Sequence, residues 1–426
     1  MSNWQRTFWA VWFANFVAAA GMQSFLPFFP SHVERLGVAD RADVALWSGL
    51  IFGAAPFSAA FMTPIWGALG DRFGRKLMVV RALLGLTVFV GLMSLAKRPE
   101  HLFLLRLGQG MFSGFMAPSI TLVSFSAPPG KQGRITGSLQ VSVAIGAMAG
   151  PLIGATFGSQ VGMAPLFLSV AAAALVGAVV ILRFASEPDV AQRAVVGEVG
   201  VAGVLRGTLR DLRDVMTNHD VRNTVILLFV LTFSYGASKP LMEIFVRDVV
   251  GEEGAVRNTG LLATLMALAS TLTLRGWGSW SDAHGHGRAL AICASISALA
   301  LCGHSLAWGF ASLVVLQLAL GFGLAGASPS SYGLAGDAVP EERRGGAFGV
   351  LFGARTLAMA TSAWAGGYLE RHLGLRGLFV AGGGAVLLAL IFLRPRRRDR
   401  APEDPASALA RESERAASGE AAVKAS

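Results

Sequence analysis

The sequence predicts an all-α membrane protein with twelve transmembrane helices in two pseudo-symmetric six-helix bundles, and three observations predict it. The chain of 426 residues is 53% hydrophobic and only 15% charged, with a mean hydropathy of +0.56, whereas soluble domains average about 25% charged residues. Twelve apolar segments are each close to the length of about 20 residues that a helix needs to cross a bilayer. Several residues also recur at one fixed offset between the two halves of the chain.

The apolar segments divide the chain into four parts. The first six span about residues 8–29, 45–68, 77–96, 101–126, 135–159 and 163–184. The last six span about 223–246, 258–280, 289–308, 310–335, 346–369 and 374–393. Helices are expected, because lipid offers no hydrogen-bond partner to an open backbone. We therefore predict an N-terminal half (1–184), a cytoplasmic linker with an amphipathic helix (185–222), a C-terminal half (223–393) and a disordered tail (394–426).

Basic residues indicate how the chain is oriented. Lys and Arg gather in the even-numbered connections, the linker and the tail, whereas the odd-numbered connections carry fewer. The positive-inside rule then places the even connections and both termini in the cytoplasm of a bacterial cell, with the spans in the lipid of its inner membrane. The formal net charge of +10 reflects this topology. We expect no nucleic-acid partner, because that would need a basic face on a soluble domain.

The second half of the chain repeats the first. Five residues return 211 positions later: Gly67, Asp71, Gly74, Gly110 and Pro118 correspond to Gly278, Asp282, Gly285, Gly321 and Pro329. One offset that holds across a loop and a distant helix indicates two related six-helix halves.

The stretch Gly67–Lys76 (GALGDRFGRK) is a short charged turn between two apolar segments, so it must lie at a membrane face. Gly67 would let another helix approach closely, and the carboxylate of Asp71 could face a helix N-terminus. The stretch resembles the signature loop between helices 2 and 3 of the major facilitator superfamily. The resemblance implies a transporter in which this loop latches the two halves together on the cytoplasmic side. The latch residues would be Gly67, Asp71, Arg72, Gly74, Arg75 and Lys76, with Asp282 in the second copy.

Two ionisable residues within the spans are candidates for proton coupling. Arg106 lies inside the fourth segment, where a buried cation should face a cavity unless it reaches outward to the membrane surface. It matches the R-x-x-x-G motif of the superfamily's fourth helix, and that resemblance implies a role in coupling. Glu243 would carry a proton if it is buried. It stands one helical turn from Lys239, which favours a structural ion pair between them over substrate binding, and Pro240 suggests a kink.

Glycines recur every four residues in the fifth segment, at Gly146, Gly150 and Gly154, with Pro151 among them. Tight helix packing alone would explain such a stripe. The pattern also resembles the fifth-helix motif of twelve-helix drug:proton antiporters, although Ala155 replaces the glycine that usually ends it. This resemblance implies multidrug efflux, as in proteins of antibiotic resistance. The alternative is an exporter of a metabolite or sugar on the same scaffold, because a fold does not fix a function.

A central cavity for a small amphipathic substrate is expected to draw on polar and aromatic residues within the spans. The candidates are Asn15, Gln23, Gln109, Phe112, Phe115, Met116, Gln140, Tyr235, Lys239, Gln317 and Trp364. No Asp or Glu lies deep in the first six segments, so the proton carrier is open. The chain lacks the clustered His, Asp or Cys of an enzyme or metal site. We therefore expect a monomeric transporter that uses protons and needs no cofactor or metal.

Overall fold

The computed structural model describes residues 3–126, 132–187, 215–340 and 343–392, together with positions 207, 210, 212 and 213. Most of the predicted linker, with its amphipathic helix, and the whole predicted tail lie outside the described residues. Every regular element within the described ranges is a helix. The residue boundaries that we assign to the linker and tail stay a prediction.

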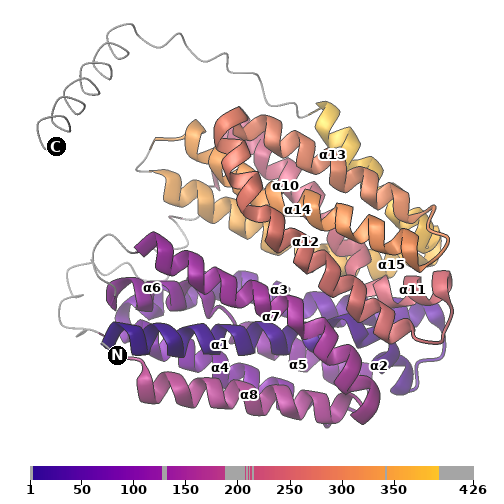
Figure 1. The fold of residues 1–426 in the computed structure, drawn as a ribbon, viewed down its shortest axis with the longest axis horizontal. Helices are drawn as coiled ribbons and strands as arrows, with labels where there is room; N and C mark the ends of the chain where they lie inside the picture. Colours follow the sequence, from indigo (N-terminus) through magenta and orange to yellow (C-terminus); the bar gives the residue numbers. More distant parts are fainter. Residues whose placement is uncertain are drawn as a thin grey trace, which may run out of the picture. The chain divides into compact units, whose positions relative to one another are not determined.

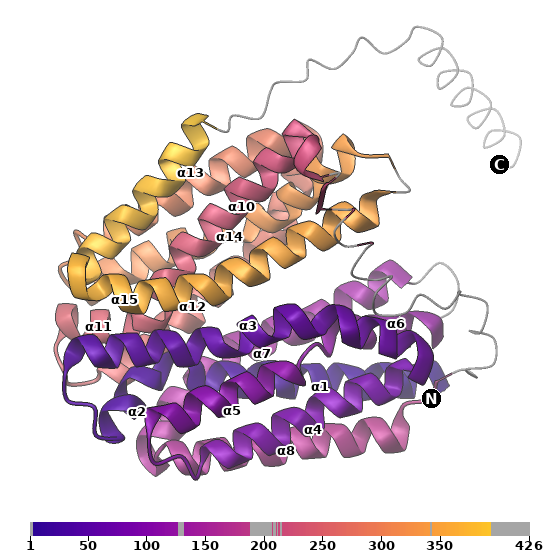
Figure 2. The same ribbon diagram turned by 180° about the vertical axis from the view of Figure 1, so that it is seen from behind.

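The first half of the chain forms one helical bundle, drawn from indigo to magenta in Figures 1 and 2. Its elements are α1 (Asn3–Phe25), η1 (Leu26–Phe28), α2 (Phe29–Arg35), α3 (Arg41–Phe73), α4 (Arg75–Met93), α5 (Pro99–Met111), α6 (Met116–Ser126), α7 (Gln132–Val161) and α8 (Met163–Phe184). The second half forms another, drawn in pink, orange and yellow. Its elements are α10 (His219–Ser238), η3 (Lys239–Leu241), α11 (Met242–Val250), α12 (Ala255–His284), α13 (His286–His304), α14 (Phe310–Ala338) and α15 (Arg344–Phe392).

Nine helices in the described ranges are long and apolar enough to cross a membrane. Three differences from the predicted segments account for this number. The fourth segment is divided between two shorter helices, and the eighth, α12, is not among the nine. The last two segments form one long helix, α15, that is broken by non-helical dihedral angles at Gly374. All twelve predicted segments therefore fall on helices.

The repeat is visible in the turns. Gly74 ends α3 with a φ of 97°, and Gly285 ends α12 with a φ of 95°. Such backbone conformations suit glycine, which has no Cβ to clash with the backbone. Gly74 and Gly285 are 211 residues apart, which is the offset of the repeat. The same turn therefore ends the second membrane span of each half.

Prolines and glycines interrupt several spans. A 3₁₀ turn that contains Pro27 separates α1 from α2, and the turn with Pro240 separates α10 from α11, where a kink was predicted. The prediction of one continuous fourth helix over 101–126 was wrong. The chain leaves the helix between α5 and α6, where Gly114 has a φ of 96°.

The buried core is apolar and continuous between the halves. It includes Phe25 and Phe29 from the first half and Phe245 and Phe379 from the second. Large apolar side chains also remain on the outside; the exposed fraction of Leu299 is 63%. Apolar residues on both the inside and the outside are expected for helices surrounded by lipid.

Candidate functional site

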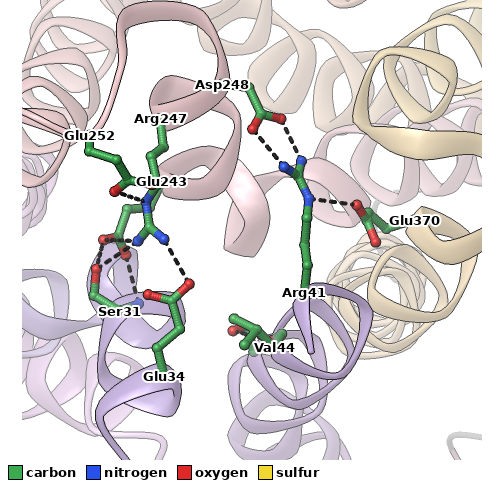
Figure 3. Close-up of polar contacts among 10 residues, drawn as sticks. Ser31, Glu34, Arg41, Val44, Glu243, Arg247, Asp248, Glu252 and Glu370 are labelled. Carbon is green, nitrogen blue, oxygen red and sulfur yellow. Dashed lines mark hydrogen bonds and ion pairs between the residues drawn. The ribbon is translucent and has the colours of Figure 1, made fainter. Parts of the chain in front are cut away.

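A buried carboxylate joins the two halves at one end of the bundle. Glu243, on α11, is 0% exposed and meets Ser31 of α2 (Figure 3). The Ser31 backbone N–H donates to one carboxylate oxygen over 3.3 Å, and the Ser31 hydroxyl donates to the other. Arg247, one turn along α11, forms an ion pair with Glu243 at 3.5 Å.

Arg247 connects Glu243 to two further acids. Its guanidinium lies 2.7 Å from the carboxylate of Glu34 on α2 and 3.2 Å from that of Glu252, just beyond α11. It also donates to the Ser31 hydroxyl oxygen over 3.1 Å. We call Ser31, Glu34, Glu243, Arg247 and Glu252 the gate cluster. Its contacts tie α2 to α11, and so one half of the chain to the other (Figure 3).

A second group of ion pairs lies near the gate cluster. Arg41, at the start of α3, donates two hydrogen bonds to Asp248 of α11 over 2.7 and 2.5 Å, and lies 3.5 Å from Glu370 of α15 (Figure 3). Arg371 pairs with Asp43 at 2.9 Å. Sequence reasoning missed these pairs. The only signal was that basic and acidic residues neighbour one another in the odd-numbered connections.

Helices of the two halves also pack closely. On α3, Gly49 is so near α15 that an added Cβ would overlap the carbonyl oxygen of Ala363. Trp364 of α15 donates from Nε1 to the carbonyl of Leu50 over 3.1 Å. Between α12 and α7, the Thr264 hydroxyl donates to the carbonyl of Met148 over 3.0 Å. Close contact of this kind needs small residues, because any side chain would separate the two backbones.

A cavity of about 50 Å³ lies between the halves. Its lining is Leu26, Pro27 and Phe52 from the first half, and Tyr235, Lys239, Met242, Thr259, Ala263, Met266 and Gln317 from the second. Tyr235, Lys239 and Gln317 were predicted to line a cavity, and the structure brings these three together. The other lining residues are mostly apolar, as expected for a site that takes an amphipathic compound.

Lys239 does not form the predicted ion pair with Glu243. Its ammonium nitrogen lies 5.5 Å from the centre of the Phe52 ring and 5.7 Å from that of Tyr235. The 3₁₀ turn at Lys239–Leu241 explains the difference. A 3₁₀ helix has about 3.0 residues per turn instead of about 3.6, so the two side chains do not share one face. Glu243 is paired with Arg247 instead.

Arg106 is buried in protein and neither lines this cavity nor reaches outward, with only 1% of its side chain exposed. Its guanidinium donates to the carbonyls of Ile51 and Phe52 on α3, over 3.3 and 3.4 Å, and to the Gln109 side chain over 2.5 Å. Phe52 also lines the cavity, so Arg106 holds in place the α3 backbone that carries this lining residue.

The other predicted cavity residues are absent from this lining. Asn15 is fully buried and accepts a hydrogen bond from Ser119, and Gln140 is exposed on α7. Gln109 is bonded to Arg106 and Trp364 to the α3 backbone, as described above. Phe112 packs against the rings of Trp66 and Phe89. The remaining three, Gln23, Phe115 and Met116, are half-buried outside the lining.

The signature loop is the turn between α3 and α4, and a carboxylate binds the N-terminus of α4. That carboxylate belongs to Glu187, which accepts from the backbone N–H groups of Arg75 and Lys76 over 2.7 and 3.1 Å. The side chains of Asp71 and Arg72 lie outside the described part. The expected close approach of a helix at Gly67 is not found, since an added Cβ would meet no described atom within 4 Å.

In the second copy of this loop, Asp282 is 76% exposed and lies 4.0 Å from His286. His286 also lies 3.6 Å from Asp337. Among the described residues, no group of three or more His, Cys, Asp and Glu side chains could hold a metal.

The glycine stripe of α7 faces α1. An added Cβ at Gly146, Gly150 or Gly154 would clash with the α1 backbone. The carbonyl of Pro151 instead approaches Gly260 of α12, at 2.7 Å from an added Cβ. The stripe therefore packs within the first half, and the proline beside it contacts the second.

Comparison with known proteins gives consistent matches. The family model described as "Major Facilitator Superfamily" matches residues 11–256 and again 224–423. The "Multidrug resistance protein MdtG" of Proteus mirabilis is 26% identical over 396 residues, which are 92% of this chain and 96% of the relative. The "Multi-drug resistance efflux pump PmrA" of Streptococcus pneumoniae is 30% identical over 293 residues, 68% of this chain and 70% of the relative.

Solved structures share the fold at low sequence identity. A nucleoside transporter, NupG, aligns with a TM-score of 0.75 at 12% identity, over 91% of this chain and 98% of its own. The human organic anion transporter MFSD10 aligns with a TM-score of 0.67 at 18% identity, over 92% of this chain and 100% of its own. At these identities the likeness concerns the fold alone.

Proposed function

Because this chain belongs to the Major Facilitator Superfamily, it is a multi-pass membrane transporter and not an enzyme, and we propose that it exports amphipathic drugs in exchange for protons. We place it as a monomer in a bacterial inner membrane, with both termini in the cytoplasm. The names of relatives that match most of the chain support drug efflux. The glycine and proline pattern of α7, which resembles that of drug antiporters, supports it too.

The lining of the cavity supports an amphipathic substrate over a sugar. Leu26, Phe52, Met242 and Met266 supply apolar surface, and few polar groups accompany them. A sugar would need a dense set of hydrogen-bonding side chains, whereas an amphipathic compound needs apolar surface and a few polar contacts.

Alternating access explains the distribution of contacts between the halves. The gate cluster and the Arg41 pairs gather at the connections that follow the first, seventh and eleventh spans. The positive-inside rule predicts that these connections are extracytoplasmic. The structure then corresponds to a transporter closed on the outside, in which the halves separate at this end to release the substrate.

The single observation that carries proton coupling is the fully buried carboxylate of Glu243 at the junction of the halves. The Glu243 carboxylate contacts the Ser31 N–H, the Ser31 hydroxyl and the Arg247 guanidinium. Arg247 in turn contacts Glu34 and Glu252. A proton on Glu243 would cancel its charge and its attraction to Arg247. The outer closure would then weaken.

Substrate binding would weaken the same closure from inside. Lys239 and Met242 line the cavity, and Glu243 follows Met242 directly in the continuous stretch of η3 and α11. The empty transporter with an ionised Glu243 stays closed, and either a proton or a substrate lets it change conformation. For exchange, the proton and the substrate must use separate halves of the cycle, so we propose that they do not occupy the transporter together.

The signature loop would act at the opposite, cytoplasmic end. When the halves close there, Gly67, Asp71, Arg72, Gly74, Arg75 and Lys76 would form the latch with the second half. Asp282 would serve the equivalent turn, and its largely exposed carboxylate is available for such a contact.

Inverted membrane vesicles test this function. Vesicles that contain the protein, energised so that their interior is acidic, should accumulate fluorescent amphipathic compounds from a panel of cationic, neutral and anionic dyes. A protonophore should abolish the accumulation, and so should Glu243→Gln. Glu252→Gln is the matched control, because Glu252 contacts the same Arg247 but is 81% exposed. If no dye of any charge accumulates although the protein is inserted, the proposal is wrong.

A further inference from the structure

Three polar side chains in the cavity have few or weak partners among the described residues. The ammonium of Lys239 lies beside the rings of Phe52 and Tyr235, and no ion pair to it is found within the described ranges. Gln317 is 3% exposed, and its side-chain oxygen has no hydrogen-bond partner in the same part of the chain. Within the described ranges, the Gln317 amide nitrogen and the Tyr235 hydroxyl donate to sulfur atoms, over 3.5 and 3.4 Å.

No counter-ion for Lys239 is found among the described residues that line the cavity. Its ten lining residues include one cation and no Asp or Glu. The nearby Glu243 is bonded to Ser31 and Arg247 instead. A cation away from water is unfavourable unless an opposite charge or water compensates it. A ligand that brings a negative charge would supply what the protein does not.

From this geometry we propose that the cavity recognises amphipathic acids, an inference that rests on the efflux function proposed above and names its substrate class. A carboxylate, sulfonate or phenolate pairs with the ammonium of Lys239. A hydrogen-bond donor of the ligand meets the free side-chain oxygen of Gln317. The apolar body of the ligand lies against Phe52, Met242 and Met266.

The size of the cavity links binding to conformational change. Its volume is about 50 Å³. Drug-sized pockets are about 300 Å³ or more. Because the lining comes from both halves, an aromatic acid enters only when Phe52 on α3 separates from Lys239 and Met242.

Three compounds with the same ring and different charge test the proposal: anthracene carboxylate, anthracene carboxamide and anthracenemethylamine. Their fluorescence anisotropy is titrated with the purified full-length protein in detergent. The wild-type protein should bind the acid most tightly and the ammonium compound least tightly. Lys239→Gln should raise the Kd of the acid at least about tenfold, since hydrogen bonds to charged groups are the strong ones. Lys239→Arg, which keeps the charge, should retain most of the preference.

Two results would overturn the proposal. One is a wild-type protein that binds the acid no more tightly than the amide, and this comparison needs no variant to fold. The other is a Lys239→Gln protein, with a wild-type melting temperature, that still prefers the acid by the wild-type ratio. Vesicles that accumulate cationic dyes while the purified protein shows no preference for the acid would leave efflux standing and reject this inference alone.

Discussion

Replacing Glu243 by Gln should favour opening of the outer end of the molecule. The amide has nearly the same size as the carboxylate and retains one oxygen that can accept from Ser31. It loses the negative charge and therefore the 3.5 Å ion pair with Arg247. Because Arg247 keeps its contacts with Glu34 and Glu252, no buried cation is left alone.

The size of the effect follows from the contacts. Hydrogen bonds to charged groups contribute about 1.5–3 kcal/mol, and those between neutral groups about 0.5–1.5 kcal/mol. The Ser31 contacts weaken to the neutral range and the Arg247 contact is lost, so the closed state should be less favoured by about 2 kcal/mol. That free energy changes the ratio of open to closed molecules roughly 30-fold.

Double electron–electron resonance between two spin labels can measure the ratio of open to closed molecules. Arg35, at the end of α2, and Arg257, near the start of α12, are exposed and lie on opposite halves. Both are changed to cysteine and labelled in a protein whose Cys293 and Cys302 are replaced. The long-distance population should grow in Glu243→Gln and, for the wild-type protein, as the pH is lowered.

The control is Glu252→Gln, which removes an exposed contact of the same Arg247. Exposed ion pairs contribute about 0–1 kcal/mol, so this change should alter the ratio by less than about fivefold. If both variants leave the distance distribution of the wild type unchanged, Glu243 does not hold the halves together, and the coupling that we propose fails.

Gly49→Ala should enlarge the same open population, because its Cβ would overlap the Ala363 carbonyl; Gly276→Ala is the control, since its Cβ meets no described atom within 4 Å. A wild-type distribution in both variants would contradict a role for this close packing. Arg106→Lys should lower the melting temperature and the transport rate, because one ammonium cannot reach every acceptor of the guanidinium; an unchanged melting curve would contradict this. Asp71→Asn should insert normally but lose transport in vesicles, and transport at the wild-type rate would exclude the latch.

Hydropathy located the spans well because it measures what the bilayer requires, which is a sufficiently long apolar segment. It could not locate breaks inside a segment. Gly114 and Gly374 interrupt helices, whereas Gly146 lies within one and packs against α1. All three look alike in an apolar stretch, and only the dihedral angles that packing imposes distinguish them.

The candidate site was harder to predict because its contacts join residues that are distant in the sequence. Tyr235, Lys239 and Gln317 were found because a polar residue inside a span is unusual. Arg41 and Asp248 lie at the ends of spans, where charge is ordinary, and nothing in a single sequence indicates that they pair. The pairing is a property of the closed arrangement of the halves.

The positions of Lys239 and Glu243 suggest why binding and proton transfer are coupled. They lie four residues apart on the continuous stretch of η3 and α11, yet they face different surroundings because the 3₁₀ turn rotates one relative to the other. Had the predicted ion pair formed, the two charges would have neutralised each other. In the observed arrangement the lysine is available to a substrate and the carboxylate is available to a proton. A displacement of this one stretch changes both sites together, so no longer route between them is required.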